Sequence, residues 1–340
     1  MMHRGESHFT AKKGSATGRL ADRPFVSLAA RTLVAGAVFV LTLIAPANAV
    51  WIGKNSANQN VTVDLHSAGP ANFRVLATGT SNNLLSLGTG TFAGNIGDAH
   101  INPAIGGGTI NGNVFLGNGI DASGLVGHGT INGTVFSNQD SFLSQPLADA
   151  SAAATAALSL KATKSLAAIN DSWFNGQDTK TITGSVGTNV LKLSSINLTQ
   201  GQTLLLSAPV GGSFVLVVNG QFNLSNSSSI VVDTSSGLLP LDVLYALGNN
   251  ANLSASGTAS RASIIDGIIL AKAGNINISF GQVNGEVIGS CDLVFSNSST
   301  SNGFSPIPEV SSFLPLLGFF SLTVIGQLFM RRRSLSLLAA

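Results

Sequence analysis

The chain has 340 residues, of which 44% are hydrophobic and only 9% charged, whereas an ordinary soluble domain is about 25% charged. Residues 50–305 carry 8 Lys and Arg against 12 Asp and Glu, a formal balance of −4, which excludes a basic phosphate-binding surface and a nucleic-acid partner. The single cysteine, Cys291, excludes an intramolecular disulfide, so the fold must depend on its core. With 39 glycines and many Asn and Ser residues, the composition favours short strands and turns.

Residues 1–49 predict a secretory signal peptide. A basic segment precedes the apolar stretch at residues 32–44, and Ala47 and Ala49 form an A-x-A cleavage pattern before Val50. The apolar stretch has about 13 residues, which is too short to cross a hydrocarbon core of about 30 Å comfortably. A buried N-terminal helix is the alternative interpretation.

The segment that follows contains a repeated unit. GTFAGNIG begins at Gly90, GTINGNVF at Gly108 and GTINGTVF at Gly129, with weaker copies from Lys180 and Gly281. Such self-similarity predicts a solenoid, in which each unit is one coil and neighbouring coils share a core. The alternation of Thr, Ile or Val with Asn and Gly predicts half-buried strands. We expect the Asn-Gly and Ala-Gly steps to supply corners with positive φ.

An alanine-rich segment interrupts the strands and predicts one long helix over about residues 145–169. Pro146 suits the first helical turn and Asp149 favours a helix N-terminus, whereas Lys161 and Lys164 lie towards the C-terminal end. An apolar stripe at helical spacing would face the solenoid. Its members are Leu158, Ala162, Leu166 and Ile169.

Residues 188–296 return to short strand-like runs separated by Gly, Asn or Ser. FVLVVNG and DGIILA are almost continuously apolar, as expected for strands buried on both faces. A twisted sandwich would also fit this half. The repeats favour a mainly β fold, a right-handed β-helix with one flanking α-helix, spanning an ectodomain at residues 50–303.

Residues 304–340 predict a C-terminal membrane segment. The 18 residues 313–330 carry no charge and would span about 27 Å as a helix. Three arginines follow, Arg331, Arg332 and Arg333, and the positive-inside rule places them in the cytoplasm. A plain C-terminal anchor is one interpretation of this segment.

Pro308-Glu309, the apolar run and the arginine cluster, in that order, resemble the PEP-CTERM sorting signal of Gram-negative bacteria. The resemblance implies recognition by an exosortase at the inner membrane, followed by transfer to the cell surface or the extracellular matrix, commonly in bacteria that make exopolysaccharide. Val310 stands where the usual motif has a second proline.

The body resembles two families of surface domain. ANFRVLATGT and the stretch from DVLYALGNN to GQVNGEVIG are similar to the DUF3494-type ice-binding β-helix. NVLKLSSINLTQGQTLLLSAPVGGSFVLVVNGQFNLS is similar to the choice-of-anchor A domain. Both resemblances imply a β-helical fold, and the first also implies ice binding as a function to be tested.

Three threonines form a candidate surface-binding column, because Thr91, Thr109 and Thr130 occupy the same position in successive repeats. An ice-binding face needs a flat, rigid and regular array, usually with threonines in register. Threonine is also an ordinary strand residue beside a solvated face. The column cannot be followed in the sequence beyond residue 134.

Catalytic patterns are absent from the sequence, which contains no G-x-S-x-G, H-E-x-x-H or calcium-binding repeat. We therefore expect no enzyme, no cofactor and no metal. Three histidines, five loosely grouped aspartates and a Trp-Phe pair are the weak candidates for chemistry or sugar stacking. They are His66, His100, His128, Asp121, Asp140, Asp149, Asp171, Asp178, Trp173 and Phe174.

Together these features predict an exported, non-enzymatic surface protein with a structural or adhesive role in an exopolysaccharide matrix. Its expected partners are an exosortase-type enzyme, the membrane and a polysaccharide. Ice binding is the alternative from a different class, and a carbohydrate-active enzyme is the second alternative.

Overall fold

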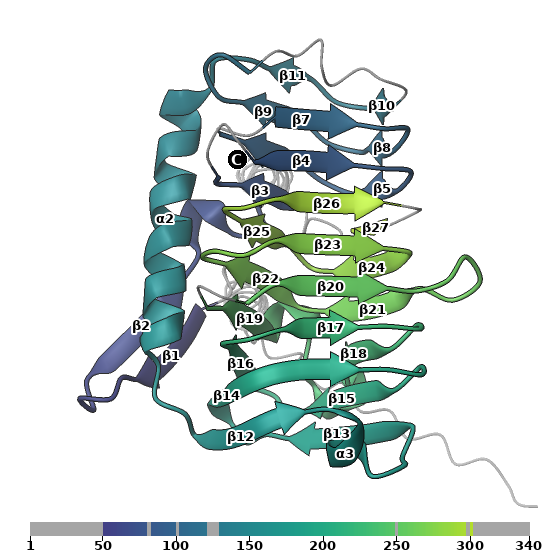
Figure 1. The fold of residues 1–340 in the computed structure, drawn as a ribbon. Coiled ribbons are helices and arrows are strands. Elements are labelled where there is room, and N and C mark those ends of the chain that lie inside the picture. Colours follow the sequence, from purple (N-terminus) through teal and green to yellow (C-terminus); the bar gives the residue numbers. More distant parts are fainter. Residues whose placement is uncertain are drawn as a thin grey trace, which may run out of the picture. The chain divides into compact units, whose positions relative to one another are not determined.

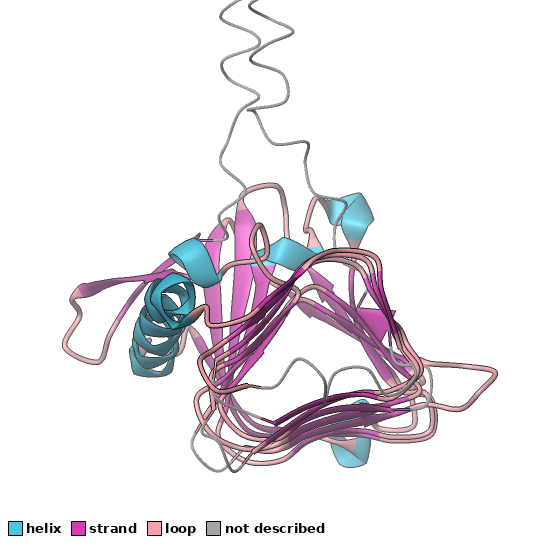
Figure 2. Cartoon of the chain, turned by 90° about the horizontal axis from the view of Figure 1, so that it is seen from above, coloured by secondary structure: helices cyan, strands magenta, loops and turns pink. Residues whose placement is uncertain are grey.

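The computed structural model describes residues 50–79, 83–99, 102–120, 129–248, 251–296 and 300–301. These residues form a parallel β-helix of triangular cross-section with one helix along its side (Figures 1 and 2). The predicted signal peptide and sorting segment lie outside the described residues. No helix in the described part is long and apolar enough to cross a bilayer.

The first side of the triangle, called the threonine face below, is a nine-stranded sheet. In spatial order its strands are β10 (Thr130–Ile131), β8 (Thr109–Ile110), β5 (Thr91–Phe92), β27 (Thr300–Ser301), β24 (Gly281–Asn284), β21 (Ser263–Asp266), β18 (Ser229–Val232), β15 (Thr203–Ser207) and β13 (Thr179–Thr183).

A second sheet supplies the other two sides, because the long strand β14 (Gly187–Leu198) belongs to both. The helix face contains β11 (Val135–Phe136), β9 (Val114–Leu116), β6 (Ile96–Asp98), β3 (Val75–Ala77), β25 (Val287–Gly289), β22 (Ile268–Ala271), β19 (Val243–Leu247), β16 (Gly212–Val218) and the first half of β14. The polar face contains the second half of β14, β17 (Phe222–Leu224), β20 (Leu253–Ser256), β23 (Ile276–Ser279), β26 (Leu293–Ser296), β4 (Leu84–Leu87) and β7 (Asn102–Ile105). Strand β12 (Lys164–Ile169) pairs with β14 at one end.

The chain does not wind in sequence order from one end to the other. It starts in the middle, builds coils to one end, and returns along α2 (Asp140–Ser159) to the opposite end (Figure 1). It then winds back until β25, β26 and β27 pair with β3, β4 and β5. We call these three pairings the seam, which joins residues about 200 positions apart into one continuous stack.

The helix prediction is partly wrong. Helix α2 begins at Asp140 and ends at Ser159, and residues 164–169 of the predicted helix form strand β12 instead. Tertiary pairing ends the helix, because the Lys161 N–H donates to the Lys54 carbonyl at 2.6 Å and residues after it pair with β14. Pro146 lies in the second turn rather than the first. The helix packs on the helix face through small side chains, Ala150, Ala153, Ala154 and Ala157.

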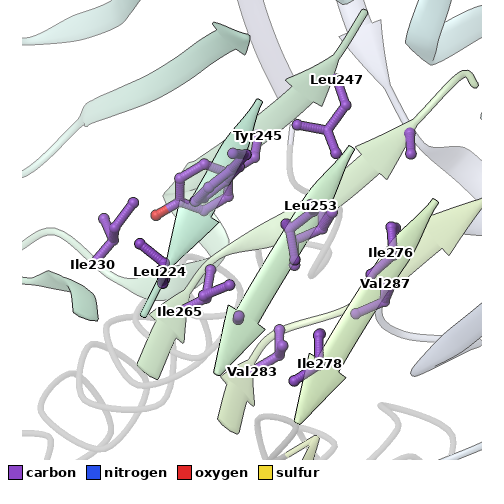
Figure 3. Packing of buried hydrophobic residues seen from close by; sticks show 14 of the residues in the cluster. Leu224, Ile230, Tyr245, Leu247, Leu253, Ile265, Ile276, Ile278, Val283 and Val287 are labelled. Atoms are coloured by element: carbon purple, nitrogen blue, oxygen red, sulfur yellow. The ribbon is translucent and has the colours of Figure 1, made fainter. Parts of the chain in front are cut away.

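Most of the core lies inside the coils, where apolar side chains from the three faces meet (Figure 3). A second apolar cluster lies between α2 and the helix face. The short helix α3 (Asp171–Phe174) closes one end of the interior with the fully buried Phe174. The 3-10 helices are η1 (His66–Ala68), η3 (Thr234–Ser236) and η4 (Pro240–Asp242).

A hairpin of β1 (Val50–Lys54) and β2 (Asn60–Asp64) precedes the coils. It begins at Val50, the residue after the predicted cleavage pattern. The buried Trp51 anchors it, because the indole N–H donates to the carbonyl of Asp242 at 3.1 Å. The Ile52 N–H donates to the hydroxyl of Thr188.

The repeated Asn-Gly steps do not have the predicted backbone. Gly112 and Gly133 lack positive φ, whereas Gly94 of the Ala-Gly step has a φ of 149°. Close stacking explains the glycines, since a Cβ at Gly112 would lie 2.3 Å from the carbonyl carbon of Gly94. The neighbouring asparagines connect successive coils through side-chain hydrogen bonds. The Asn95 side chain accepts from the Asn113 N–H at 2.9 Å, and the Asn113 side chain accepts from the Thr134 N–H at 3.0 Å.

Substitution of Gly112 tests this close stacking. We expect Gly112→Ala to lower the free energy of unfolding by at least about 2 kcal/mol, because the added methyl group meets backbone that cannot yield. Gly106→Ala is the matched control, since a Cβ there has its nearest neighbour at 4.0 Å. Urea unfolding of both variants measures the difference, and equal stability would contradict the stacking argument.

The seam contains two buried ionisable residues that interact electrostatically. Arg74 and Glu286 precede the paired strands β3 and β25, and both are almost fully buried. Burial raises the pKa of Glu286 well above its ordinary value, and the positive charge of Arg74 opposes that shift. Burial also lowers the pKa of Arg74. The seam is therefore sensitive to the ionisation of Glu286.

A pH titration of stability tests this conclusion. A carboxyl group whose pKa is raised on folding stabilises the fold fully below its unfolded value, near 4.5, and this contribution is lost as pH rises through the folded pKa. We expect Glu286→Gln to remove part of the fall in melting temperature that wild type shows as pH rises above that value. Asp171→Asn is the control. An unchanged slope in the Gln variant would refute the assignment.

Candidate functional site

The predicted threonine column is in register in the structure. Thr91 pairs with Thr109, and Thr109 with Thr130, across β5, β8 and β10. The residues that follow them in each strand point into the core, so the threonines point outward. Next to the column, the Asn132 amide donates to the Asn111 side chain at 2.7 Å. This patch is uncharged, and on the other side of β5 the strand β27 places Thr300 at the corresponding register position, because Ser301 pairs with Phe92.

The column continues at the far end of the same face. Thr179 pairs with Thr203, and Thr203 with Ser229. Between the two ends, β21 and β24 place Ile264 and Gln282 at the corresponding position. The threonine face therefore has two short arrays of hydroxyl groups with a different surface between them.

The polar face carries a longer array that sequence inspection missed. Successive strands present an Asn or Ser and, two residues later, a Ser or Thr. The five pairs are Asn197 and Thr199, Asn223 and Ser225, Ser254 and Ser256, Asn277 and Ser279, and, with a valine in the first position, Val294 and Ser296. Register places the first members side by side across β14, β17, β20, β23 and β26.

This array is flat and uncharged, and its side chains are short. The apolar residue between the two members of each pair is buried, as Leu198, Ala255 and Ile278 show, so both polar members point outward. Neighbouring strands lie about 4.8 Å apart, which repeats each column at that spacing. The array continues with small residues across the seam, since Ser86 pairs with Val294 and Ala104 with Ser86.

A ladder of side chains fixes one border of the polar face. The Asn252 side chain accepts from the Asn275 N–H at 2.8 Å, and the Asn275 side chain accepts from the Asp292 N–H at 3.3 Å. The Asp292 carboxylate accepts from the Leu84 N–H at 2.9 Å. The last bond crosses the seam, and the Asn83 amide adds a bond to the Ser290 carbonyl. The ladder uses its polar groups internally, whereas Asn197, Ser254 and Asn277 of the first column make no side-chain hydrogen bond within the described part of the chain.

A weak sequence pattern indicates this array. INLT, FNLS, LSAS and INIS share alternating polar and apolar residues. Their unequal spacing hides the repeat, because loops of different length connect the coils.

The described aspartates and histidine among the candidates for chemistry each have a local partner in the fold. Asp140, Asp149 and Asp171 each fix local structure, accepting bonds from the Asn118 N–H, Ser67 and the Thr199 hydroxyl, respectively. His66 is exposed and lies 3.3 Å from Asp64. Among the described residues, no three His, Cys, Asp or Glu side chains could hold a metal ion. His100, His128 and Asp121 lie outside the described residues.

Three further residues, Cys291, Trp173 and Tyr245, each have a partner within the described part of the fold. The thiol of the half-buried Cys291 accepts from the Gly274 N–H at 3.3 Å. Trp173 lies beside Phe174 at the closed end of the coils, and the Lys180 ammonium lies 4.4 Å from the centre of its ring. Tyr245 is buried and donates to the carbonyl of Asp266 at 3.0 Å.

A small cavity of about 160 Å³ lies between α2 and the helix face. Ala150, Ser151 and Ala154 line one side, and Lys272 and Ser290 lie among the residues opposite. It holds no group of paired acids or nucleophiles and belongs to the packing of the alanine-rich helix.

The other predicted residues lie outside the described residues: the cleavage pattern Ala47 and Ala49, and the sorting motif Pro308, Glu309, Arg331, Arg332 and Arg333. These assignments stay predictions.

Comparison with known proteins gives structural neighbours only. No family model and no curated protein matches the chain. The ice-binding protein LeIBP from an Arctic yeast is similar at 18% identity and a TM-score of 0.49, covering 73% of this chain and 96% of that one. The DUF3494 domain of ice-binding protein 1 from Shewanella frigidimarina is similar at 16% identity and a TM-score of 0.46, covering 68% and 95%. An ice-binding protein from an Antarctic biological consortium is similar at 19% identity and a TM-score of 0.44, covering 70% and 89%.

The mainly β, parallel architecture with few helices is established by the strand pairing of the described residues themselves.

Two substitutions on the polar face test whether the ladder contributes more to stability than the outward-facing columns do. We expect Asp292→Ala to lower the free energy of unfolding by about 1–2 kcal/mol, because the Leu84 N–H loses its acceptor at the seam. Ser254→Ala should change it by less than about 0.5 kcal/mol, since the structure gives that hydroxyl no hydrogen bond within the described part. Thermal and urea unfolding measure both, and equal losses would contradict the distinction.

Proposed function

We propose that this protein binds ice through its polar face. The observation that carries the proposal is the in-register array of Asn, Ser and Thr on five successive coils, from Asn197 on β14 to Ser296 on β26. A surface that recognises a lattice must repeat at a fixed spacing and must not rearrange. Backbone pairing fixes the spacing at about 4.8 Å, and the ladder of Asn252, Asn275 and Asp292 holds the border.

The chemistry of the face suits ordered water. Asn197, Ser254 and Asn277 are exposed and make no side-chain hydrogen bond within the described part, so their polar atoms are available to water. No charged side chain occupies either column to organise water around itself. The threonine column on β5, β8 and β10 is the second and smaller array, and the same experiment tests it.

Adhesion to a polysaccharide matrix is the second candidate function. The specific observation is the amide content of the polar face, because Asn197, Asn223 and Asn277 offer both donors and acceptors, as a hydroxyl-rich polymer requires. Export by a cleaved signal peptide and sorting by an exosortase at Pro308-Glu309 are compatible with ice binding and with adhesion. Both are proposals supported by the sequence patterns at the two ends of the chain.

Inhibition of ice recrystallisation tests the main proposal. We expect the wild-type protein to inhibit recrystallisation at micromolar concentration, and Ser254→Lys with Asn277→Lys to abolish inhibition, because long charged side chains break the flat array. Thr109→Lys is the matched control on the threonine face and should retain activity. Melting temperatures confirm that all variants are folded.

Three other results contradict the proposal. An inactive wild type excludes ice binding. Loss of activity only in Thr109→Lys assigns binding to the threonine face. Equal activity in all variants excludes both arrays.

A further inference from the structure

Four phenylalanines gather at the end of the helix face where α2 begins. Phe115 lies on β9, Phe136 on β11 and Phe142 in the first turn of α2, while Phe73 lies just before β3. Phe115 stacks on Phe136 with ring centres 5.1 Å apart and planes at 10°, and on Phe142 at 4.6 Å and 29°. Phe73 supports them, meeting Phe115 edge-on at 6.2 Å.

The two outer rings remain accessible. Phe73 is 1% exposed, whereas Phe136 is 38% and Phe142 46% exposed. Phe115 and Phe136 occupy paired positions on adjacent strands, so they form a stack along the coil axis. In the described part of the chain, β11 is the last strand of its sheet. The stack therefore ends in exposed aromatic surface, called the aromatic shelf below.

Polar groups border the aromatic shelf within a few residues. The Asp140 carboxylate accepts from the Asn118 N–H through one oxygen at 2.8 Å, which leaves its second oxygen as an acceptor. The Gln139 amide donates to the Ser137 carbonyl at 2.9 Å, which leaves its oxygen free. Two acceptors thus lie between Phe136 and Phe142 along the chain.

We propose that the aromatic shelf binds the pyranose ring of a neutral polysaccharide. Sugar rings of the polymer pack their apolar faces against the exposed rings of Phe136 and Phe142, which both stack on Phe115, and sugar hydroxyls donate to Gln139 and Asp140. The negative charge of Asp140 selects against anionic polymers. This site is separate from the polar face and does not depend on ice binding.

The aromatic pair of Trp173 and Phe174 cannot take this role. Phe174 is fully buried, and Lys180 occupies the ring face of Trp173 while donating to its carbonyl. The exposed valines and leucine on the loops, such as Val186 and Val210, offer no planar surface. Stacking on a sugar requires an exposed flat ring, which Phe136 and Phe142 of the aromatic shelf provide.

Retention on insoluble polysaccharides tests the proposal, using the full-length chain in mild detergent with microcrystalline cellulose, chitin and agarose as probes. We expect at least one polymer to retain the protein. The double variant Phe136→Ala, Phe142→Ala should weaken retention about five- to tenfold, because it removes the stacking surface. Phe136→Trp should keep or strengthen retention. Alginate added in solution, as an anionic competitor, should have no effect.

Two controls make the result specific. Leu84→Ala alters another exposed apolar side chain, 39% exposed, and should leave retention unchanged. Val210→Ala alters a loop side chain that is 79% exposed and should also leave retention unchanged. Ice binding is measured separately by recrystallisation, so a failure of ice binding stays separate from a failure of this proposal. No retention of wild type by any polymer, full retention by the Ala double variant, or loss in Phe136→Trp or Val210→Ala would each overturn the assignment.

Discussion

The architecture depends on the seam, where the last coils of the chain pair with the first. β25, β26 and β27 bind β3, β4 and β5 on all three faces, so contacts between residues about 200 positions apart complete the stack. Phe92 and Phe295 meet across it inside the core, with ring centres 5.3 Å apart. Without the seam, the chain would be two short solenoids with exposed edge strands joined by a helix, and exposed edges invite association with other chains.

The same seam creates the proposed functional surface. The polar face takes five strands from the C-terminal coils and two from the N-terminal coils, and the Asp292–Leu84 hydrogen bond crosses the boundary. Continuous register is what makes a row of ordinary asparagines and serines into a regular array. The aromatic shelf uses a different consequence of the topology, because it forms where the first set of coils ends and α2 begins. One protein can thus present a lattice-like face and a separate sugar-stacking surface.

Local pattern was sufficient to predict the coils and the register of Thr91, Thr109 and Thr130, because near-identical repeats stack on themselves. It was insufficient for the end of α2. Leu166 and Ile169 fit a helical stripe equally well, and only pairing with β14 decides for a strand. The Asn-Gly steps predicted positive φ at Gly112, yet contact with the coil below requires the glycine. The seam and the polar face could not be predicted from local sequence patterns, because loops of unequal length separate the residues that the fold places in register.

Cross-linking across the seam tests the central claim most directly. Ser86 and Val294 are register partners on the outside of the polar face, within the range of Cα separations that a disulfide can bridge. Cysteines at these two positions, with Cys291 replaced by serine, should form an intramolecular disulfide on mild oxidation, whereas cysteines at Ser86 and Asn277 should not. Failure of the first pair to close within one molecule, or closure of the second pair instead, would contradict the stacking of the first coils on the last.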